Sequence, residues 1–153
     1  MEKPIVGILM GSESDREVMD VCLKQCRELG IAAELLVSSA HRNPESTRDY
    51  ARGARDRGLK VLIAGAGMAA HLAGACASES TLPVIGVPLA GGALGGMDAL
   101  LATVQMPKGV PVATVAIGSS GARNAAILAA QILALSDPEM EERLLELRRG
   151  WGS

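Results

Sequence analysis

Aromatic side chains are nearly absent from this sequence. Tyr50 and Trp151 are the only two, there is no phenylalanine, and aromatic residues make up 1% of the 153 positions. Base-stacking platforms of the kind that bind single-stranded nucleic acid are therefore excluded. Hydrophobic residues nevertheless reach 48%, so the core has to be built mainly from small and aliphatic side chains. Side chains of this size allow strands and helices to pack closely.

Two further features are missing: an excess of charge of one sign and a long uninterrupted hydrophobic run. The formal net charge is −2, which excludes the basic face of a general nucleic-acid binder. Between positions 60 and 98 Glu79 is the only formal charge, but glycine and proline divide this segment into apolar runs of strand length. The pattern predicts a buried parallel sheet rather than a membrane span. No signal-peptide pattern precedes the first predicted strand, so we expect a cytoplasmic protein.

Cysteine and histidine are too few to form a metal site or a disulfide framework. Cys22 and Cys26 lie four residues apart on a predicted helix, and Cys76 stands alone. We interpret all three as small buried hydrophobic residues in a reducing compartment. The two histidines, His41 and His71, are far apart and show no His-x-x-x-His spacing. No transition-metal site is predicted.

Short apolar runs alternate with helical patterns along the whole chain. The predicted strands are 4–10, 32–37, 60–64, 83–88 and 112–117. The predicted helices are one that ends at Gly30, then 44–57, a short helix after the glycine-rich segment 65–74, 97–104, 122–135 and 137–151. This alternation predicts an α/β protein with a three-layer, doubly wound parallel sheet of the flavodoxin or Rossmann type. We expect one catalytic domain spanning residues 1–153.

The two last predicted helices differ in character. Segment 122–135 is apolar on nearly all sides, which a single sheet face cannot cover, so we expect a second subunit to bury part of it. Segment 137–151 has one apolar stripe and charges elsewhere. We expect this C-terminal helix to pack on a neighbouring subunit.

The segment 38–44 is the strongest candidate for a functional site. It follows the apolar run 32–37 and ends in Asn43-Pro44, which are suited to begin a helix. It therefore lies where a strand gives way to a helix, the edge at which open α/β sheets bind ligands. His41 and Arg42 follow two serines in this segment. A proton carrier beside a cation and hydroxyl groups suits an anionic substrate.

Each of the other candidates for a functional role has two interpretations. Segment 65–70 fits a loose dinucleotide-binding pattern, but no acidic residue ends the following predicted strand, which disfavours a nicotinamide cofactor. His71 is either a ligand contact or a packed histidine bonded to backbone. Asp15 either favours the helix dipole or, in a loop with Ser12 and Ser14, presents its carboxylate to sugar hydroxyls.

Several blocks of sequence together resemble one family. They are Met10–Asp15, Ser39–Arg42, Ile63–Gly67, Ala69–Leu72, Val104–Pro107, Ala116–Gly118 and 124–134. In order and over nearly the whole chain, these blocks resemble the aminoimidazole ribonucleotide carboxylase family of purine biosynthesis. The Ala-Gly-Ala-Gly-x-Ala-Ala-His block resembles its class I, or mutase, branch.

The resemblance implies an isomerase that moves the carboxylate of N5-carboxyaminoimidazole ribonucleotide to C4 by decarboxylation and recarboxylation, with His41 as general acid and base. The alternative is the sister activity, direct carboxylation of aminoimidazole ribonucleotide with CO2. The residues expected to bind the ribonucleotide are Ser12, Ser14, Asp15, Ser39, Arg42, Gly67, Ala69 and His71. The resemblance further implies no metal, no cofactor and a homo-octamer.

The sequence departs from the family pattern beside the expected pocket. Met68 stands where a second glycine is usual, Ala73 stands where proline is usual, and segment 90–96 lacks the family's serines. These departures bear on the shape of the pocket rather than on the chemistry of His41. Besides the mutase and the direct carboxylase, a third hypothesis is a flavodoxin-like module that binds a nucleotide or a flavin without catalysis. Aromatic rings to enclose a flavin are scarce, however.

Overall fold

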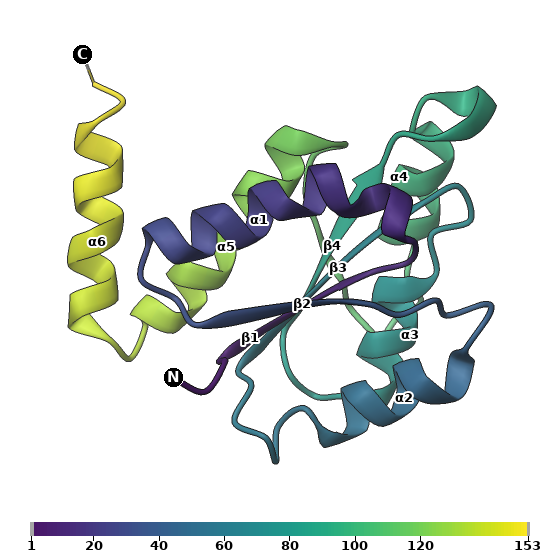
Figure 1. The fold of residues 1–153 in the computed structure, drawn as a ribbon, viewed down its shortest axis with the longest axis horizontal. Helices are drawn as coiled ribbons and strands as arrows, with labels where there is room; N and C mark the ends of the chain where they lie inside the picture. The colour runs from purple at the N-terminus through teal and green to yellow at the C-terminus, as the bar shows by residue number, and fades with distance from the viewer. Residues whose placement is uncertain (1, 153) are drawn as a thin grey trace.

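The fold is a single five-stranded sheet between layers of helices. The computed structural model describes residues 2–152, so positions 1 and 153 of the expected domain lie outside the described residues. The strands are β1 (Val6–Met10), β2 (Ala33–Val37), β3 (Val61–Gly67), β4 (Val84–Leu89) and β5 (Ala113–Thr114). All neighbouring pairs are parallel, in the order β2-β1-β3-β4-β5. Strands β1 to β4 are labelled in Figure 1. The predicted doubly wound parallel sheet is confirmed.

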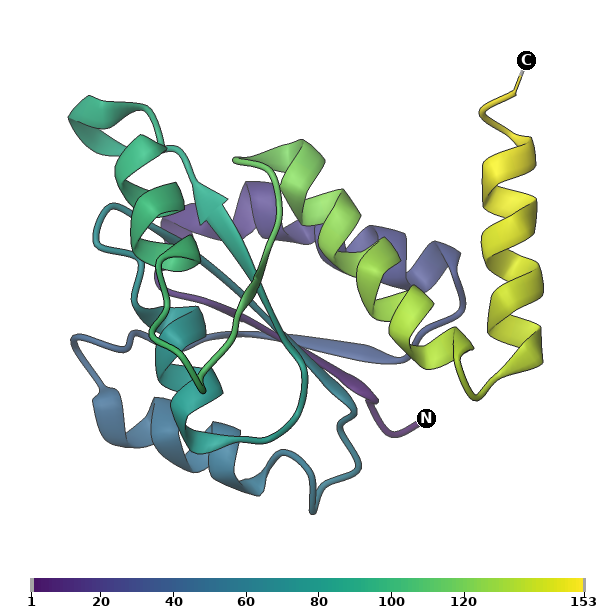
Figure 2. The ribbon, with the colours of Figure 1, turned by 180° about the vertical axis from the view of Figure 1, so that it is seen from behind.

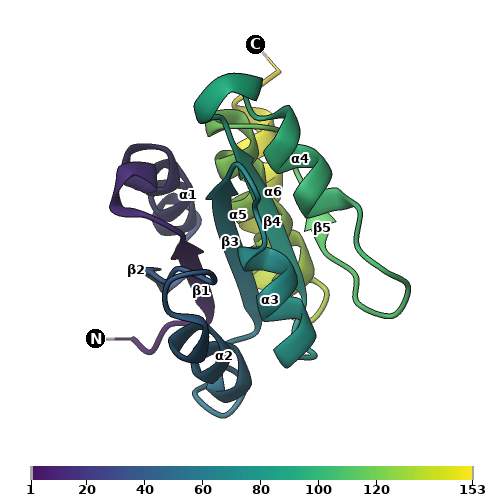
Figure 3. The same ribbon diagram turned by 90° about the vertical axis from the view of Figure 1, so that its right-hand side faces the viewer.

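Within residues 2–152, six α-helices and two short 3-10 turns connect and cover the strands. They are η1 (Glu13–Asp15), α1 (Arg16–Glu28), α2 (Pro44–Gly53), α3 (Leu72–Glu79), η2 (Gly92–Leu94), α4 (Met97–Val104), α5 (Ser119–Ala134) and α6 (Pro138–Arg149). Viewed end-on, α1 and α5 cover one face of the sheet while α2 and α3 cover the other (Figure 3). The three layers predicted from the sequence are therefore present.

Side chains alternate along the central strands and build a separate core on each face of the sheet. On β1, Val6, Ile8 and Met10 belong to the core beneath α1 and α5, whereas Leu9 belongs to the core beneath α2 and α3. This alternation is the period of two expected of a strand buried on both faces. The three cysteines are free and buried, and burial raises the pKa of the Cys76 thiol to about 12. The interpretation of the cysteines as small hydrophobic residues is confirmed.

The third strand is longer than its hydrophobic run predicts. It continues through Gly67, because Ala66 and Gly67 pair with the last two residues of β4. Gly65 is required for close packing rather than for a turn, since a Cβ there would overlap the sulfur of Met19 on α1. The glycines that predicted a loop therefore form the end of a strand.

The fifth strand is shorter than predicted, two residues instead of 112–117. The carbonyls of Gly86 and Pro88 accept hydrogen bonds from the Val115 and Gly118 amides, at 3.1 and 2.9 Å. Pro88 has no N–H to donate in return, so the ladder between β4 and β5 stops early.

The apolar helix α5 is covered largely from within the chain. It packs against α1, α6 and strands β3 and β4, and eight of its residues are buried. The expectation that one sheet face cannot cover it is right, but α1 and α6 supply much of the remaining cover. The last helix, α6, stands beyond the end of α5 (Figure 2) and buries Met140 against the core. No helix among residues 2–152 is long and apolar enough to cross a membrane.

Candidate active site

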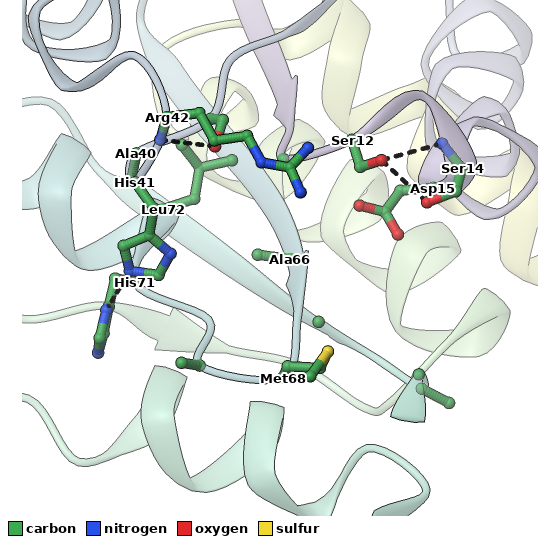
Figure 4. Close-up of a pocket in the computed structure, with 16 residues that line it drawn as sticks. Ser12, Ser14, Asp15, Ala40, His41, Arg42, Ala66, Met68, His71 and Leu72 are labelled. Atoms are coloured by element: carbon green, nitrogen blue, oxygen red, sulfur yellow. Dashed lines mark hydrogen bonds between the residues drawn. The ribbon is translucent and has the colours of Figure 1, made fainter. Parts of the chain in front are cut away.

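The carboxyl ends of four strands meet around one cavity. Strand order reverses between β1 and β3, and at such a switch point the loops on either side diverge and leave a crevice. A cavity of about 430 Å³ lies there, between the loops that follow β1, β2, β3 and β4 (Figure 4). All nine residues predicted for the site line it: Ser12, Ser14, Asp15, Ser39, His41, Arg42, Gly67, Ala69 and His71.

The loop between β2 and α2 is held in place by its own polar side chains. The buried hydroxyls of Ser38 and Thr47 are hydrogen-bonded at 2.7 Å, which ties the loop to the first turns of α2. The Asn43 side chain accepts a hydrogen bond from the Ser46 amide at 3.3 Å and so caps that helix, as its position before Pro44 predicts. These bonds fix the turn that carries the histidine.

The same loop directs a cation into the cavity. The Ser39 hydroxyl accepts a hydrogen bond from the Arg42 backbone amide at 3.1 Å, so Ser39 both lines the cavity and shapes the turn. The Arg42 side chain extends from this turn toward Ser12 on the far side of the opening (Figure 4). Because its guanidinium is exposed and forms no ion pair among the described residues, it is available to an anionic ligand.

The two histidines of the chain are in direct contact. His41 Nε2 lies 2.7 Å from His71 Nδ1, and the rings meet edge to face at an interplanar angle of 87°. The loops that follow β2 and β3 thus reach across the end of β1, which separates those strands in the sheet. Of the two interpretations of His71, the one in which its ring bonds to nearby backbone is wrong for Nδ1, because this nitrogen bonds to His41.

The loop between β1 and α1 supplies hydroxyls and one carboxylate. Ser12 Oγ accepts a hydrogen bond from the Ser14 amide at 3.3 Å and lies 2.9 Å from the Ser14 hydroxyl. Asp15 follows them at the N-terminus of α1, where its side chain forms no cap hydrogen bond. Partial burial raises the pKa of the Asp15 carboxyl above its ordinary value, and a hydrogen bond from the Ser12 backbone acts in the opposite direction. A desolvated carboxylate without a side-chain partner is suited to accept hydrogen bonds from ligand hydroxyls.

The end of β3 forms the floor of the cavity and carries a strained residue. Met68 has a φ of +54°, in the left-handed region that glycine adopts without cost. Its side chain is 60% exposed and packs beside Gly92 of the loop that follows β4. The departure from glycine at this position therefore sets strained backbone and a flexible thioether at the pocket rim.

Six further small or apolar residues that line the cavity were not among the predicted binding residues, although segment 90–96 was expected beside the pocket. They are Gly11, Ala40, Ala66, Leu72, Ala90 and Gly91. None carries a reactive group, so residue type gave no signal. Their position at the carboxyl ends of predicted parallel strands was the one feature that placed them at this edge.

The arrangement suits proton transfer on a small anionic ligand. One imidazole can exchange a proton with the ligand, a guanidinium can hold a phosphate or a carboxylate, and a carboxylate can hold sugar hydroxyls. Small residues and backbone line the rest, which leaves room for a compact group. Among residues 2–152, no three His, Cys, Asp or Glu side chains gather closely enough to hold a metal ion.

Comparison with known proteins finds curated relatives that are identical to this chain at more than half of the aligned residues. The chain is 55% identical over 146 residues to N5-carboxyaminoimidazole ribonucleotide mutase of Bacillus subtilis, covering 95% of this chain and 90% of the relative. It is 54% identical over 143 residues to the Pyrococcus horikoshii protein of the same name, covering 94% and 80%.

The fold and the family model agree with these relatives. A crystal structure of Treponema denticola PurE matches with a TM-score of 0.85 at 29% identity, covering 96% of this chain and 90% of that one. The family model described as AIR carboxylase matches residues 5–151. With nearly every residue inside that match, the chain belongs to the AIR carboxylase family.

Proposed function

We propose that this chain is an N5-carboxyaminoimidazole ribonucleotide mutase, an isomerase of purine biosynthesis. The observation that carries the proposal is the meeting of His41 and Arg42 in one cavity of a chain whose curated relatives bear that name. The substrate is a small ribonucleotide, which needs one cation for its phosphate and one acid–base group for its imidazole. The cavity offers both.

Proton and bond changes balance around a single imidazole. Protonated His41 gives its proton to the exocyclic nitrogen as the N–C bond of the carbamate breaks, which yields aminoimidazole ribonucleotide and CO2. The nucleophilic C4 carbon then attacks the trapped CO2 and forms the new C–C bond. Neutral His41 removes the C4 proton, which restores the aromatic ring and the protonated imidazole. General acid–base catalysis of this kind is worth ~10²–10⁴-fold, so the enclosure and positioning of CO2 supply the remainder.

Substrate binding follows from the charges around the cavity. Arg42 and the Ser12 hydroxyl hold the phosphate, and Asp15 accepts hydrogen bonds from the ribose. The wall around the nucleotide is completed by Ser14, Ser39, Gly67, Ala69 and His71. Gly67 and Ala69 leave the backbone accessible, so the carboxylate can approach where no large side chain intrudes.

Two candidate substrates separate the mutase from the direct carboxylase. The purified chain is given either N5-carboxyaminoimidazole ribonucleotide, or aminoimidazole ribonucleotide with bicarbonate, and formation of the C4-carboxylated product is followed. We expect turnover of the carbamate that does not rise with added bicarbonate. Turnover that instead requires aminoimidazole ribonucleotide and scales with bicarbonate would assign the chain to the carboxylase. If neither substrate is turned over, the chain would instead be assigned as a binding module without catalysis.

Assembly into a homo-octamer is part of the same proposal. Met97, Leu101 and Val104 form an exposed apolar stripe along α4, at 53%, 54% and 45% exposure. Near the C-terminus Leu145 and Trp151 are also exposed, which supports contact between the 137–151 segment and a neighbouring subunit. Light scattering on the purified chain should give eight subunits, and Leu101→Glu should lower that number. A monomer at micromolar concentration would contradict the proposal.

A cytoplasmic location completes the proposal. The three cysteines are free thiols, which fits a reducing compartment. The buried thiols at Cys22 and Cys26 make no disulfide. Cell fractionation with an antibody to the chain measures the location directly.

A further inference from the structure

The contact between the two histidines determines which nitrogen of His41 faces the cavity. His41 Nε2 is engaged by His71 Nδ1 at 2.7 Å, and the edge of the ring that carries the other nitrogen turns toward the middle of the cavity (Figure 4). A hydrogen bond between two imidazole nitrogens needs one proton between them, so one ring donates and the other accepts. The nitrogen left for the ligand is therefore Nδ1 of His41.

His71 is anchored by the backbone at the start of α3. It occupies the N-cap of α3, between Ala70 and Leu72, which are buried at 3% and 2% exposure. Its backbone amide donates to the Ala69 carbonyl at 2.9 Å, and its carbonyl accepts from the Ala75 amide at 2.8 Å. His71 is exposed and its ring makes no cap hydrogen bond with the helix, and among the described residues the bond to His41 is the one side-chain hydrogen bond of that ring.

We propose that His71 is the positioning residue for His41, and that Nδ1 of His41 carries the catalytic proton. His41 donates Nε2–H to the lone pair of His71 Nδ1. Nε2–H is present both in neutral His41 and in its protonated form, so this bond persists while Nδ1 gives up and regains a proton. The bond strengthens when His41 is charged, because a charged donor binds a neutral acceptor more strongly.

This role rests on the proposed function for its kinetic consequence but not for its geometry. Without His71, the His41 ring is free to rotate about its side-chain bonds, and either nitrogen can carry the proton of the neutral form. A fraction of the enzyme then presents the wrong nitrogen or the wrong angle to the substrate. Such a loss falls on kcat, since ground-state binding depends on Arg42 and Asp15.

Two variants of one residue separate positioning from a direct substrate contact. His71→Phe keeps a ring but removes the acceptor, and His71→Asn restores an acceptor oxygen at the place of Nδ1. We expect His71→Phe to lower kcat about tenfold to a hundredfold, less than loss of the acid–base group itself, with KM within about twofold. His71→Asn should recover most of that loss. Thermal unfolding should change little in both, because His71 is exposed and its ring forms no other side-chain hydrogen bond among the described residues.

Nitrogen-15 NMR tests the geometry without turnover. With two histidines in the chain, labelled histidine gives four ring nitrogens, and each variant leaves only those of His41. In the substrate-free protein we expect neutral His41 to carry its proton on Nε2, and His71→Phe to convert this to a mixture of tautomers. If wild-type carbamate turnover is absent while this spectrum is found, the proposed function fails and the positioning stands.

Three results would overturn the positioning role. They are a His41 proton on Nδ1 in the wild-type spectrum, an unchanged kcat in His71→Phe, and a KM increase that His71→Asn does not reverse. The last result would make His71 a direct substrate contact. A wild-type spectrum as expected together with unchanged kcat would reduce the histidine bond to a structural contact.

Discussion

Each end of the parallel sheet has its own cavity, and the larger cavity carries the less reactive side chains. The one at the carboxyl ends of the strands measures about 430 Å³, and the one at the opposite end, beside the start of β4, measures about 720 Å³. Among the described residues that line the larger cavity, Glu79 is the one charged side chain, and Arg48 and Arg52 pair with it at 3.7 and 2.6 Å. The smaller cavity holds two imidazoles, a guanidinium and a partly desolvated carboxylate. The larger volume and the reactive side chains therefore lie at opposite ends of the sheet, and the proposed site is at the smaller cavity.

The sharpest way to test this contrast is one neutralising substitution at each end. His41→Asn should lower kcat by ~10²–10⁴-fold while the nucleotide still binds, because the variant loses the acid–base group and keeps the cation. Glu79→Gln should leave kcat unchanged, because Glu79 lies outside the site. Steady-state kinetics and calorimetric binding measure both variants. Near-normal turnover in His41→Asn would remove the central residue of the mechanism.

A second pair of variants compares arginines at the two ends. Arg42→Gln should raise KM about tenfold to a hundredfold, since a charged hydrogen bond to phosphate is worth about 1.5–3 kcal/mol. Arg55, which donates to the Thr81 hydroxyl at 3.0 Å near the larger cavity, provides the matched control. Arg55→Gln should leave KM unchanged. Equal effects in the two variants would indicate that overall charge, not the position of Arg42, attracts the substrate.

Backbone strain also distinguishes the site. Met68→Gly and Met68→Ala remove the same long side chain, but only glycine adopts a φ of +54° without penalty. The free energy of unfolding of Met68→Gly should be about 1 kcal/mol higher than that of Met68→Ala. This measured difference is the relief of backbone strain less the cost of glycine's greater freedom in the unfolded chain. Urea denaturation of both variants gives the difference. An alanine variant of equal or greater stability would show that the position is not strained.

The smallest expected effect concerns the carboxylates of the β1–α1 loop. Folding raises the pKa of Asp15, so its ionisation opposes folding once the pH exceeds the ordinary aspartate pKa. Asp15→Asn should then stabilise the protein at neutral pH by less than about 0.5 kcal/mol, and the gain should vanish in acid, where both states are protonated. The pKa of Glu13 is lowered by its hydrogen bond from Arg16, so Glu13→Gln should shift stability in the opposite direction. Thermal unfolding across the acidic range compares the two, and shifts of the same sign would contradict the assignment.

Most of the fold was predictable because hydrophobic runs and helix signals are local. Asn43-Pro44 predicts the start of α2 correctly, and the apolar run before Met10 predicts β1. The length of β5 was not predictable from its own residues, since it depends on the missing N–H of Pro88 in a neighbouring strand. The glycines at the end of β3 wrongly predicted a loop for a similar reason. Gly65 is small because of Met19 on another element.

The candidate site was predictable as a set of residues but not as an arrangement. Each reactive side chain follows an apolar run, and parallel strands bring such positions to one edge. The bond between His41 and His71 depends on strand order, because β1 lies between the strands that carry them. The roles proposed for these residues stay predictions until the variants above are measured.

The scarcity of aromatic residues has a practical consequence at the far end of the molecule. Trp151 is the single tryptophan of the chain, it follows α6, and 60% of its surface is open to solvent. Its intrinsic fluorescence therefore reports on the environment of the C-terminal segment without interference from a second indole. A shift of its emission to shorter wavelength on concentration would follow subunit association in real time, in the unlabelled protein and with every residue of the pocket left intact.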